Sequence, residues 1–398
     1  MEIKKAATAG TLESSDCMVT VEPGEGKVDF SLESSVINQY GNQLRKVALE
    51  TLKNLDIDNV RITIVDKGAL DCTLKARIEG AVFRSVDQYE NLPWRCHSMN
   101  NPNKKRLRRT MMFLNAQKPG LIKDPYIYKA DSLMLDLEDA VAENQKDVAR
   151  FSLYHALKTV DYRGAERVVR INGLDTPYWR EDIRACVAGG CDSIRIPKTE
   201  HAEDVRRVAA AIAEDEKTYG RPEGEVLIIA ALESARGVMN ALEICESDER
   251  LFGIALSGGD YTKDLQTHIT GTGIELMGAR QQMIIAARAA GVQCFDTVYT
   301  DLKDMDGFRK DVENIHLMGF DGKSIINPRQ IPIVHEIFTP TQKDIIFAEK
   351  VVKEIDSKKA LGIGVFTVDG KMIDIAFYDG AKRTIDLAKA SGVYKGDL

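Results

Sequence analysis

Several features that place a chain in a common class are missing from this sequence. Its 398 residues include seven cysteines, an odd number with no CxxC pair, which argues against a disulfide framework and agrees with reduced thiols. The six histidines show no zinc-ligand spacing such as HxxxH. No apolar run reaches the length of a membrane span, and the first ten residues contain no signal-peptide hydrophobic segment. We therefore expect a soluble, cytoplasmic protein with no membrane partner.

Positive charge and phosphate-binding glycines are also scarce. The formal charge of −7 argues against broad contact with nucleic acid, and the basic run 104–109 has no interleaved aromatic residues. Gly322–Ser324 resembles the end of a phosphate loop, but Leu317 stands where the first glycine of a Walker motif would fall. We expect neither a nucleic-acid partner nor a Walker-type nucleotide site.

The chain has enough apolar residues for a substantial core. Hydrophobic residues make up 44% and charged residues 29%, ordinary values for a globular protein, and the length predicts more than one domain. Before position 95, apolar periodicity predicts a small α+β domain with strands at 18–23, 28–34 and 60–65 and helices at 36–55 and 71–84.

One segment of this first domain has no regular pattern. Ala7–Met18 (ATAGTLESSDCM) places two adjacent serines, Ser14 and Ser15, among small residues. Its composition alone is typical of a flexible N-terminal arm. A polar stretch that is basic at its end, 95–109, then predicts a solvated linker.

From Thr110 onward, short buried runs alternate with helical patterns. The runs fall at 110–115, 132–139, 167–172, 193–198, 226–233, 251–260, 292–298 and 322–327. Eight strand–helix units in succession predict a (β/α)8 barrel. The alternative is a doubly wound sheet. That fold would require a glycine-rich fingerprint after its first strand, and residues 115–120 contain none.

Charged and polar side chains stand at the ends of these runs, and in a barrel the carboxyl ends of all strands meet at one face. They are Asp136, Glu138, Asp139, Arg170, Asn172, Lys198, Glu233 and Asp260. Each one alone has an ordinary explanation as a cap or an ion-pair partner, and Glu233 is equally an acid favoured by a helix dipole. Together they predict one polar pocket.

The residue types of this pocket predict its ligands. Glu233 and Asp260, with no histidine or cysteine nearby in the sequence, suit Mg²⁺ completed by water and substrate oxygens. Arg170 suits bidentate binding of a substrate carboxylate.

Three motifs of the first domain carry a family resemblance: AGTLESSD, DKGALDCTLKAR and LPW. They resemble the acyl carrier protein, or gamma subunit, of citrate lyase, over essentially all of residues 1–97. The resemblance implies a phosphoribosyl-dephospho-CoA prosthetic group on the serine after TLE, which is Ser14 here. Ser15 stands where that family commonly has glycine. A serine on a mobile arm would increase the reach of the long thiol that it carries.

A second set of motifs runs from about Leu107 to the end of the chain: RRTMMF, LMLDLEDAV, VVRINGLD, IRIPKTE, ALESARG, CFDTVYTD, GFDGKSIINPRQ and GKMID. They resemble the citrate lyase beta subunit, the citryl-acyl-carrier lyase. The resemblance implies a (β/α)8 barrel that cleaves a citryl thioester to oxaloacetate and an acetyl thioester with Mg²⁺. By position, Glu233 and Asp260 match the metal ligands, and Arg170 and Glu233 the substrate-binding residues.

Two segments depart from the family pattern. FLNAQK replaces FVPGAN after the first barrel strand, and GGDY replaces GAEDY, so Gly259 stands in place of an acidic neighbour of Asp260. The second change removes an acid that would support the metal ligands.

The tail shares the resemblance. In related acyl-thioester lyases it is a lid from which an aspartate reaches a neighbouring subunit's active site, and Asp374 in GKMID is the match. This implies a catalytic Asp374 and a homo-oligomer, although by the residues alone Asp374 would be an ordinary turn acid. The resemblance also implies an alpha subunit, the acetyl-carrier:citrate transferase, that loads citrate onto the carrier.

These inferences divide the chain into a carrier domain at 1–97, a linker at 98–109, a barrel lyase at 110–340 and a C-terminal helical lid at 341–398. The predicted reaction is a retro-Claisen cleavage within a citrate lyase complex that serves citrate fermentation.

Two alternative functions stay open. One is a lyase for a malyl-CoA or methylmalyl-CoA type of thioester, with the first domain as a docking module. The other is a non-catalytic scaffold that presents the carrier to a transferase.

Overall fold

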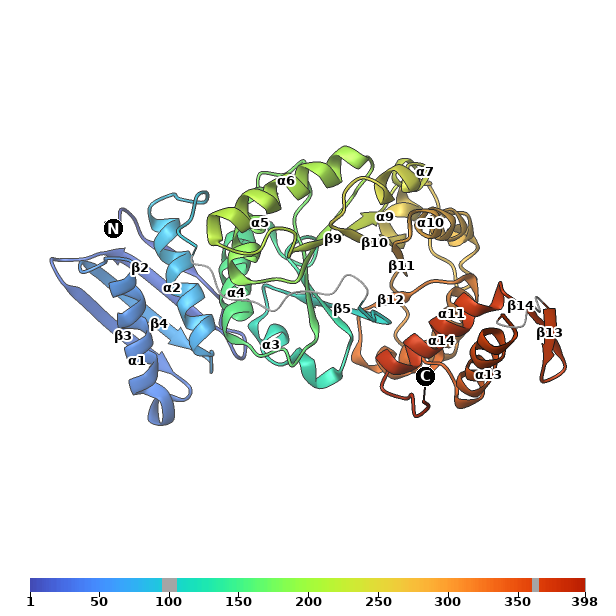
Figure 1. Ribbon diagram of the computed structural model, residues 1–398. Coiled ribbons are helices and arrows are strands. Elements are labelled where there is room, and N and C mark those ends of the chain that lie inside the picture. Colours follow the sequence, from blue (N-terminus) through green and yellow to red (C-terminus); the bar gives the residue numbers. More distant parts are fainter. Residues whose placement is uncertain (95–105, 360–364, 398) are drawn as a thin grey trace.

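The computed structural model describes residues 1–94, 106–359 and 365–397. An N-terminal α+β unit, a central barrel and a C-terminal helical unit follow one another across the molecule (Figure 1). Of the predicted linker, only residues 106–109 belong to the described ranges. No helix in the part of the chain that the structure describes is long and apolar enough to cross a membrane.

The N-terminal unit packs two helices against one face of a four-stranded sheet. Its elements are β1 (Ala7–Ala9), β2 (Cys17–Pro23), β3 (Val28–Ser34), α1 (Ile37–Asn54), β4 (Val60–Asp66) and α2 (Asp71–Ser85). The strand order is β1-β2-β4-β3, in which only the β3–β4 pair is parallel. Alternating side chains of β2 and β4 enter the core, so the small α+β fold that their patterns predict is confirmed.

The prediction of a flexible N-terminal arm is wrong. Ala7–Ala9 forms β1, which pairs antiparallel with β2. Farther along, the side chain of Asp16 is buried, and its two oxygens accept hydrogen bonds from Nε and Nη2 of Arg77 at 2.8 and 3.0 Å. Composition did not reveal this anchor because the partner of Asp16 lies 61 residues along the chain, in α2.

The same unit is docked on the barrel rather than only tethered to it. Nη1 of Arg77 donates to the hydroxyl of Ser152 at 2.9 Å, on the barrel helix α4 (Lys146–Thr159). The indole of Trp94 packs on the rings of Phe151 and Tyr154 of the same helix, with centroids 5.1 and 4.6 Å away. These buried contacts place the first domain against one side of the barrel (Figure 1).

Eight parallel strands close the barrel, which confirms the predicted (β/α)8 architecture. They are β5 (Thr110–Asn115), β6 (Ser132–Asp136), β7 (Glu166–Arg170), β8 (Ser193–Ile196), β9 (Leu227–Leu232), β10 (Leu251–Leu256), β11 (Gln293–Asp296) and β12 (Gly322–Ile325). β12 pairs with β5 and completes the ring.

Helices cover the outside of the barrel. Besides α4 they are α3 (Pro119–Ile122), α5 (Trp179–Gly189), α6 (Ala202–Tyr219), α7 (Ala235–Met239), α8 (Ala241–Cys245), α9 (Gly258–Asp264), α10 (Met277–Ala290), α11 (Met305–Met318) and α12 (Ile331–Phe338). Short 3-10 turns lie at Pro125–Tyr128, Glu143–Gln145, Ile274–Leu276 and Pro328–Gln330.

The barrel interior is apolar at its centre and polar toward the carboxyl ends of the strands. Met134 and Val168 belong to the inner apolar core. Two residues farther along each strand the next inward side chains are charged, because successive residues alternate between the two faces. Asp136 of β6 pairs in register with Arg170 of β7, and Arg170 pairs with Arg195 of β8.

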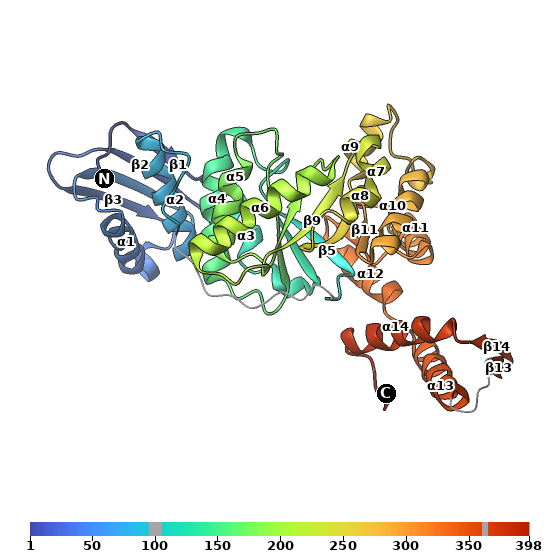
Figure 2. The same ribbon diagram turned by 45° about the horizontal axis from the view of Figure 1, so that its top comes forward.

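The C-terminal unit has a small core of its own. It consists of α13 (Gln342–Lys359), the hairpin β13 (Val365–Val368) and β14 (Lys371–Asp374), and α14 (Phe377–Ala390). Nη2 of Arg383 donates to Asp321, which directly precedes β12 and therefore lies at the amino end of that strand. The unit thus contacts the barrel away from the carboxyl ends of the strands, and it lies apart from the barrel in Figure 2.

Candidate active site

An arginine held by acids forms one wall of the site. Nε and Nη2 of Arg170 donate to the two oxygens of Asp136, each at 2.7 Å. Nη1 of Arg170 lies 3.0 Å from Glu138 and 3.2 Å from Asp139, in the loop after β6. Asp136 also accepts from the backbone of Glu138 at 2.9 Å, which holds this loop against the strand end. Arg170 is therefore fully engaged by protein acids.

Glu138 joins this wall to the end of β8. Its Oε1 accepts a hydrogen bond from Nζ of Lys198 at 2.9 Å. The backbone of Lys198 is left-handed, with φ of 49°, a costly conformation for a residue with a side chain. Burial raises the pKa of Glu138 to about 7, although Arg170 and Lys198 both oppose the rise. This carboxyl group consequently changes its protonation near neutral pH.

Glu233 is the carboxylate at the end of β9, and the residues after it explain its position. Ser234 caps α7 by accepting from the backbone N–H of Gly237 at 3.1 Å. A side chain at Gly237 would lie 2.5 Å from the carbonyl of Thr199, so only glycine permits this close approach to the loop after β8. The motif ALESARG thus ends a strand with an acid and starts a helix immediately.

The carboxylate of Glu233 is buried without a hydrogen bond of ordinary geometry. Its side chain is 3% exposed, and neither oxygen has a hydrogen-bond partner among the described residues. Burial raises its pKa, and the positive charges of Arg195 and Arg170 oppose that rise, as do the Ser257 hydroxyl and the Lys198 backbone, which lie near the carboxylate but outside ordinary hydrogen-bond geometry. A buried carboxylate in this state is costly unless a cation or a donor reaches it.

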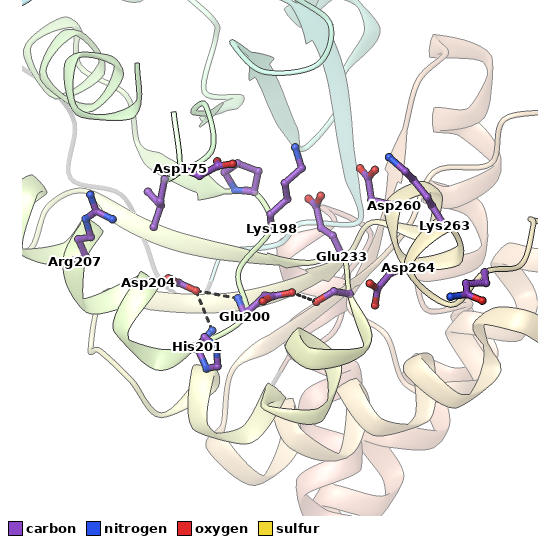
Figure 3. A pocket seen from close by; sticks show the side chains of 14 residues that line it. Asp175, Lys198, Glu200, His201, Asp204, Arg207, Glu233, Asp260, Lys263 and Asp264 are labelled. Atoms are coloured by element: carbon purple, nitrogen blue, oxygen red, sulfur yellow. Dashed lines mark hydrogen bonds between the residues drawn. The ribbon is translucent and has the colours of Figure 1, made fainter. Parts of the chain in front are cut away.

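Asp260 faces Glu233 from the next strand. It lies in the first turn of α9, directly after β10, and Figure 3 shows Glu233, Asp260 and Lys198 extending into one space. A cavity of about 780 Å³ is lined by these three residues. A second cavity of about 390 Å³ is lined by Asp260, Arg170 and Arg195, so Asp260 lies between the two. Among the described residues, no group of three or more histidine, cysteine or acidic side chains is arranged around a common metal position.

Sequence reasoning missed Arg195, although the signal was present. Ser193 and Arg195 alternate with the buried residues Ile194 and Ile196 along β8. That alternation places Arg195 inside the barrel, next to Arg170.

Ser14 and Asp374 lie outside this cluster. Ser14 is exposed in the N-terminal unit, and the neighbouring Ser15 hydroxyl accepts from Nζ of Lys123 at 3.1 Å. Lys123 follows α3, in the connection after β5, so the serine pair lies beside the rim of the barrel. Asp374 ends β14 and caps a turn by accepting from the backbone of Ala376 at 2.9 Å. The structure therefore brings together Arg170, Glu233 and Asp260, but not the other two predicted residues.

The fold and the site together define a class of protein. A closed (β/α)8 barrel that gathers acids and arginines at the carboxyl ends of its strands has the architecture of a barrel enzyme. Residues 109–328 match the family model described as HpcH/HpaI aldolase/citrate lyase, and residues 4–85 match that of the malonate decarboxylase delta subunit.

Individual relatives agree with the family models. The chain is 49% identical over 289 residues to citrate lyase subunit beta of Leuconostoc mesenteroides subsp. cremoris, which covers 73% of this chain and 96% of that protein. It is 34% identical over 286 residues to a (3S)-malyl-CoA thioesterase of Cereibacter sphaeroides, which covers 72% and 96%. A solved structure of CitE from Mycobacterium tuberculosis, in complex with magnesium, acetoacetate and coenzyme A, has a TM-score of 0.59 at 27% identity. It covers 72% of this chain and 100% of that one.

The chain belongs to the HpcH/HpaI aldolase/citrate lyase family. Its barrel is a carbon–carbon lyase of the citryl lyase and aldolase type, and an acyl-carrier-like domain precedes it. The prediction of an enzyme is confirmed, and the alternative of a non-catalytic scaffold is wrong.

Proposed function

We propose that the chain cleaves a citryl thioester, carried by its own N-terminal domain, into oxaloacetate and an acetyl thioester. The observation that carries the proposal is the unpaired, buried carboxylate of Glu233 facing Asp260 beside Arg170. The reaction is a retro-Claisen cleavage. The citryl hydroxyl loses its proton, the bond between the carbinol carbon and the α-carbon of the thioester breaks, and the resulting enolate takes up a proton.

The donor set fits a divalent cation. The two orphaned oxygens of Glu233 are the groups that a hard cation would satisfy, and Asp260 adds a second carboxylate. Mg²⁺ held by Glu233 and Asp260 would supply stabilisation of the negative charge that develops on the substrate oxygens. The relative from Mycobacterium tuberculosis was crystallised with magnesium, which supports this choice of ion.

Three residues of the chain orient the substrate in this proposal. Arg170 binds a substrate carboxylate through Nη1, where the carboxylate replaces the exposed Asp139. Glu138 stays 3.0 Å from Nη1, and Asp136 holds the other two nitrogens in place. Glu233 would contact the substrate as well as the cation. Asp374 of a second copy enters to take part in proton transfer, which requires a homo-oligomer.

The experiment that tests the site is Glu233→Gln in the full-length chain. Citryl-CoA cleavage should fall at least about 1,000-fold, because the substitution removes a charge from the cation site and the developing negative charge loses its stabilisation. Mg²⁺ should also no longer raise the melting temperature. Glu200→Gln is the control, because Glu200 lines the same cavity but its carboxylate already accepts from Ser234. Unchanged turnover by the Glu233 variant contradicts the assignment.

Ser14 carries the phosphoribosyl-dephospho-CoA group in this proposal. It is exposed, whereas the hydroxyl of Ser15 is engaged by Lys123. Intact-mass measurement of protein from its native host should show the added group in the wild type and in Ser15→Ala, and no added mass in Ser14→Ala. A modified Ser14→Ala protein refutes this choice.

The proposed partner subunit and the division of the chain into domains depend on the proposed lyase activity. An alpha subunit, the acetyl-carrier:citrate transferase, would load citrate onto the carrier within a cytoplasmic citrate lyase complex. We divide the chain for this purpose into carrier 1–97, linker 98–109, barrel 110–340 and lid 341–398. A malyl-CoA type of substrate is the second candidate, because a (3S)-malyl-CoA thioesterase is 34% identical to this chain. Parallel assays with citryl-CoA and malyl-CoA separate the two.

A further inference from the structure

Arg195 differs from the other buried arginines of the described structure. The side chains of Arg77, Arg108 and Arg195 are almost completely buried. Arg77 meets the carboxylate of Asp16, and Arg108 meets that of Glu166, each through two nitrogens. No carboxylate of the described residues lies within ion-pair distance of Arg195, although its guanidinium is 1% exposed at most.

Most donors of Arg195 are unused. Nη2 donates to the hydroxyl of Ser257 at 3.1 Å, and Nε and Nη1 have no hydrogen-bond partner. The ring of Phe113, with its centroid 5.3 Å from the guanidinium carbon, offers partial compensation as a cation–π contact. A buried guanidinium remains costly unless an anion accepts its N–H groups. Glu233, Glu138 and Asp136 supply negative charge nearby, but none of them accepts from Nε or Nη1, so these N–H groups are open to an anionic ligand.

A ligand has access to these donors. Arg195 lines the cavity of about 390 Å³ together with Arg170 and Asp260, and the buried hydroxyl of Ser324, which also lacks a partner, lies in the same wall. Arg170 is the in-register neighbour of Arg195, and its guanidinium carbon lies 5.1 Å from the same Phe113 ring. Two guanidinium groups side by side suit a ligand with two carboxylates.

The chemistry of the proposed reaction identifies the second carboxylate. A citryl thioester carries a carboxylate and a carboxymethyl group on its carbinol carbon, whereas a malyl thioester has hydrogen in place of the carboxymethyl group. We propose that Arg195 binds the carboxymethyl carboxylate and thereby determines selectivity for citryl over malyl thioesters. The inference rests on the proposed lyase function, in which Arg170 takes the carboxylate that both substrates share.

The test compares the full-length Arg195→Met variant with the wild type. It measures turnover of two substrates, citryl-CoA and malyl-CoA, and binding of two ligands, oxaloacetate and glyoxylate. The catalytic efficiency toward citryl-CoA should fall about 100-fold, the typical cost of removing one partner of a buried charge pair, while that toward malyl-CoA changes less than about threefold. Calorimetric titration in Mg²⁺ should show the same loss for oxaloacetate and none for glyoxylate, which lacks the extra carboxylate. Arg195→Lys should retain part of the selectivity, because it keeps the charge.

The melting temperature distinguishes a role of Arg195 in substrate selectivity from a purely structural role. Arg195→Met breaks no ion-pair contact and removes only a neighbouring charge from Glu233, so its melting temperature should fall much less than that of Arg77→Met, which breaks the buried ion pair with Asp16 and should lower it by several degrees. Arg207→Met is the control, because Arg207 lines the larger cavity and rests on the ring of Trp179; it should leave the citryl-to-malyl ratio unchanged. Equal losses toward both substrates, or no loss toward either, overturn the proposal. If the wild-type chain cleaves neither thioester, the proposed lyase function is refuted. The titrations with oxaloacetate and glyoxylate then still test whether Arg195 binds the extra carboxylate.

Discussion

Glu138 holds its carboxyl group between Lys198 and Arg170, with almost no access to water. Burial raises its pKa from an ordinary value of 4.5 to about 7. The folded protein therefore binds more protons than the unfolded chain between these two pH values. Stability contributed by the protonated group is present below pH 4.5 and is lost as the pH rises through 7.

The expected consequence is a pH dependence that Glu138→Gln removes. In EDTA, the free energy of unfolding of the wild type should fall by about 3 kcal/mol more than that of the variant between pH 4.5 and 7.5, because glutamine does not ionise. Urea unfolding at several pH values measures the difference. Parallel curves for the two proteins would show that the pKa of Glu138 is not raised.

Among the elements, α2 and the loop before β2 decide how the carrier domain meets the barrel. One guanidinium, that of Arg77, binds Asp16 in the serine loop, Ser152 on α4 and the carbonyl of Gln117 after β5. The loop that carries Ser14 is therefore anchored at its base, and its serine lies at a defined place beside the barrel. An attached thiol arm would swing from a fixed origin, which raises its effective concentration at the site.

Arg77→Met tests this anchor. The variant leaves the carboxylate of Asp16 buried without its partner, so the free energy of unfolding should fall by about 3–5 kcal/mol. Arg61→Met is the matched control in the same unit, because the ion pair of Arg61 with Asp29 is exposed and should contribute less than about 1 kcal/mol. Urea unfolding compares the two, and similar losses would contradict a special role for Arg77.

At the scale of the whole molecule, the C-terminal unit lies away from the candidate active site of its own chain. Its contact through Arg383 and Asp321 is at the amino end of β12, whereas Glu233 lies at the carboxyl end of β9. The hairpin and the turn after it expose Met372, Ile375 and Phe377, an apolar surface next to Asp374. If Asp374 is catalytic, it acts in the site of another copy.

Complementation checks this arrangement. Asp374→Asn and Glu233→Gln should each be inactive alone, but co-expression should restore activity in mixed oligomers. About a quarter of the wild-type rate is expected for random pairing, since each working site needs one intact residue from each of two chains. Size-exclusion chromatography with light scattering supplies the oligomeric state. A monomer, or an inactive mixture of the two variants, would refute a shared site.

The sequence by itself determined the barrel and the position of its acids along the strands. Buried runs such as 110–115 and 226–233 are local patterns, and closure of a parallel barrel brings their carboxyl ends together in every case. Glu233, Asp260 and Arg170 were therefore predictable as neighbours from their places at strand ends, and the family motifs identified them independently.

Tertiary structure alone decided which charges are paired. The carboxylate of Asp16 is neutralised by an arginine 61 residues away, whereas Arg195 and Glu233 are buried with donors and acceptors unused. Burial and pairing depend on residues that are distant in the chain, so no local pattern records them. The docking of the carrier loop and the position of the C-terminal unit also depend on contacts between distant residues, so only the folded molecule shows them.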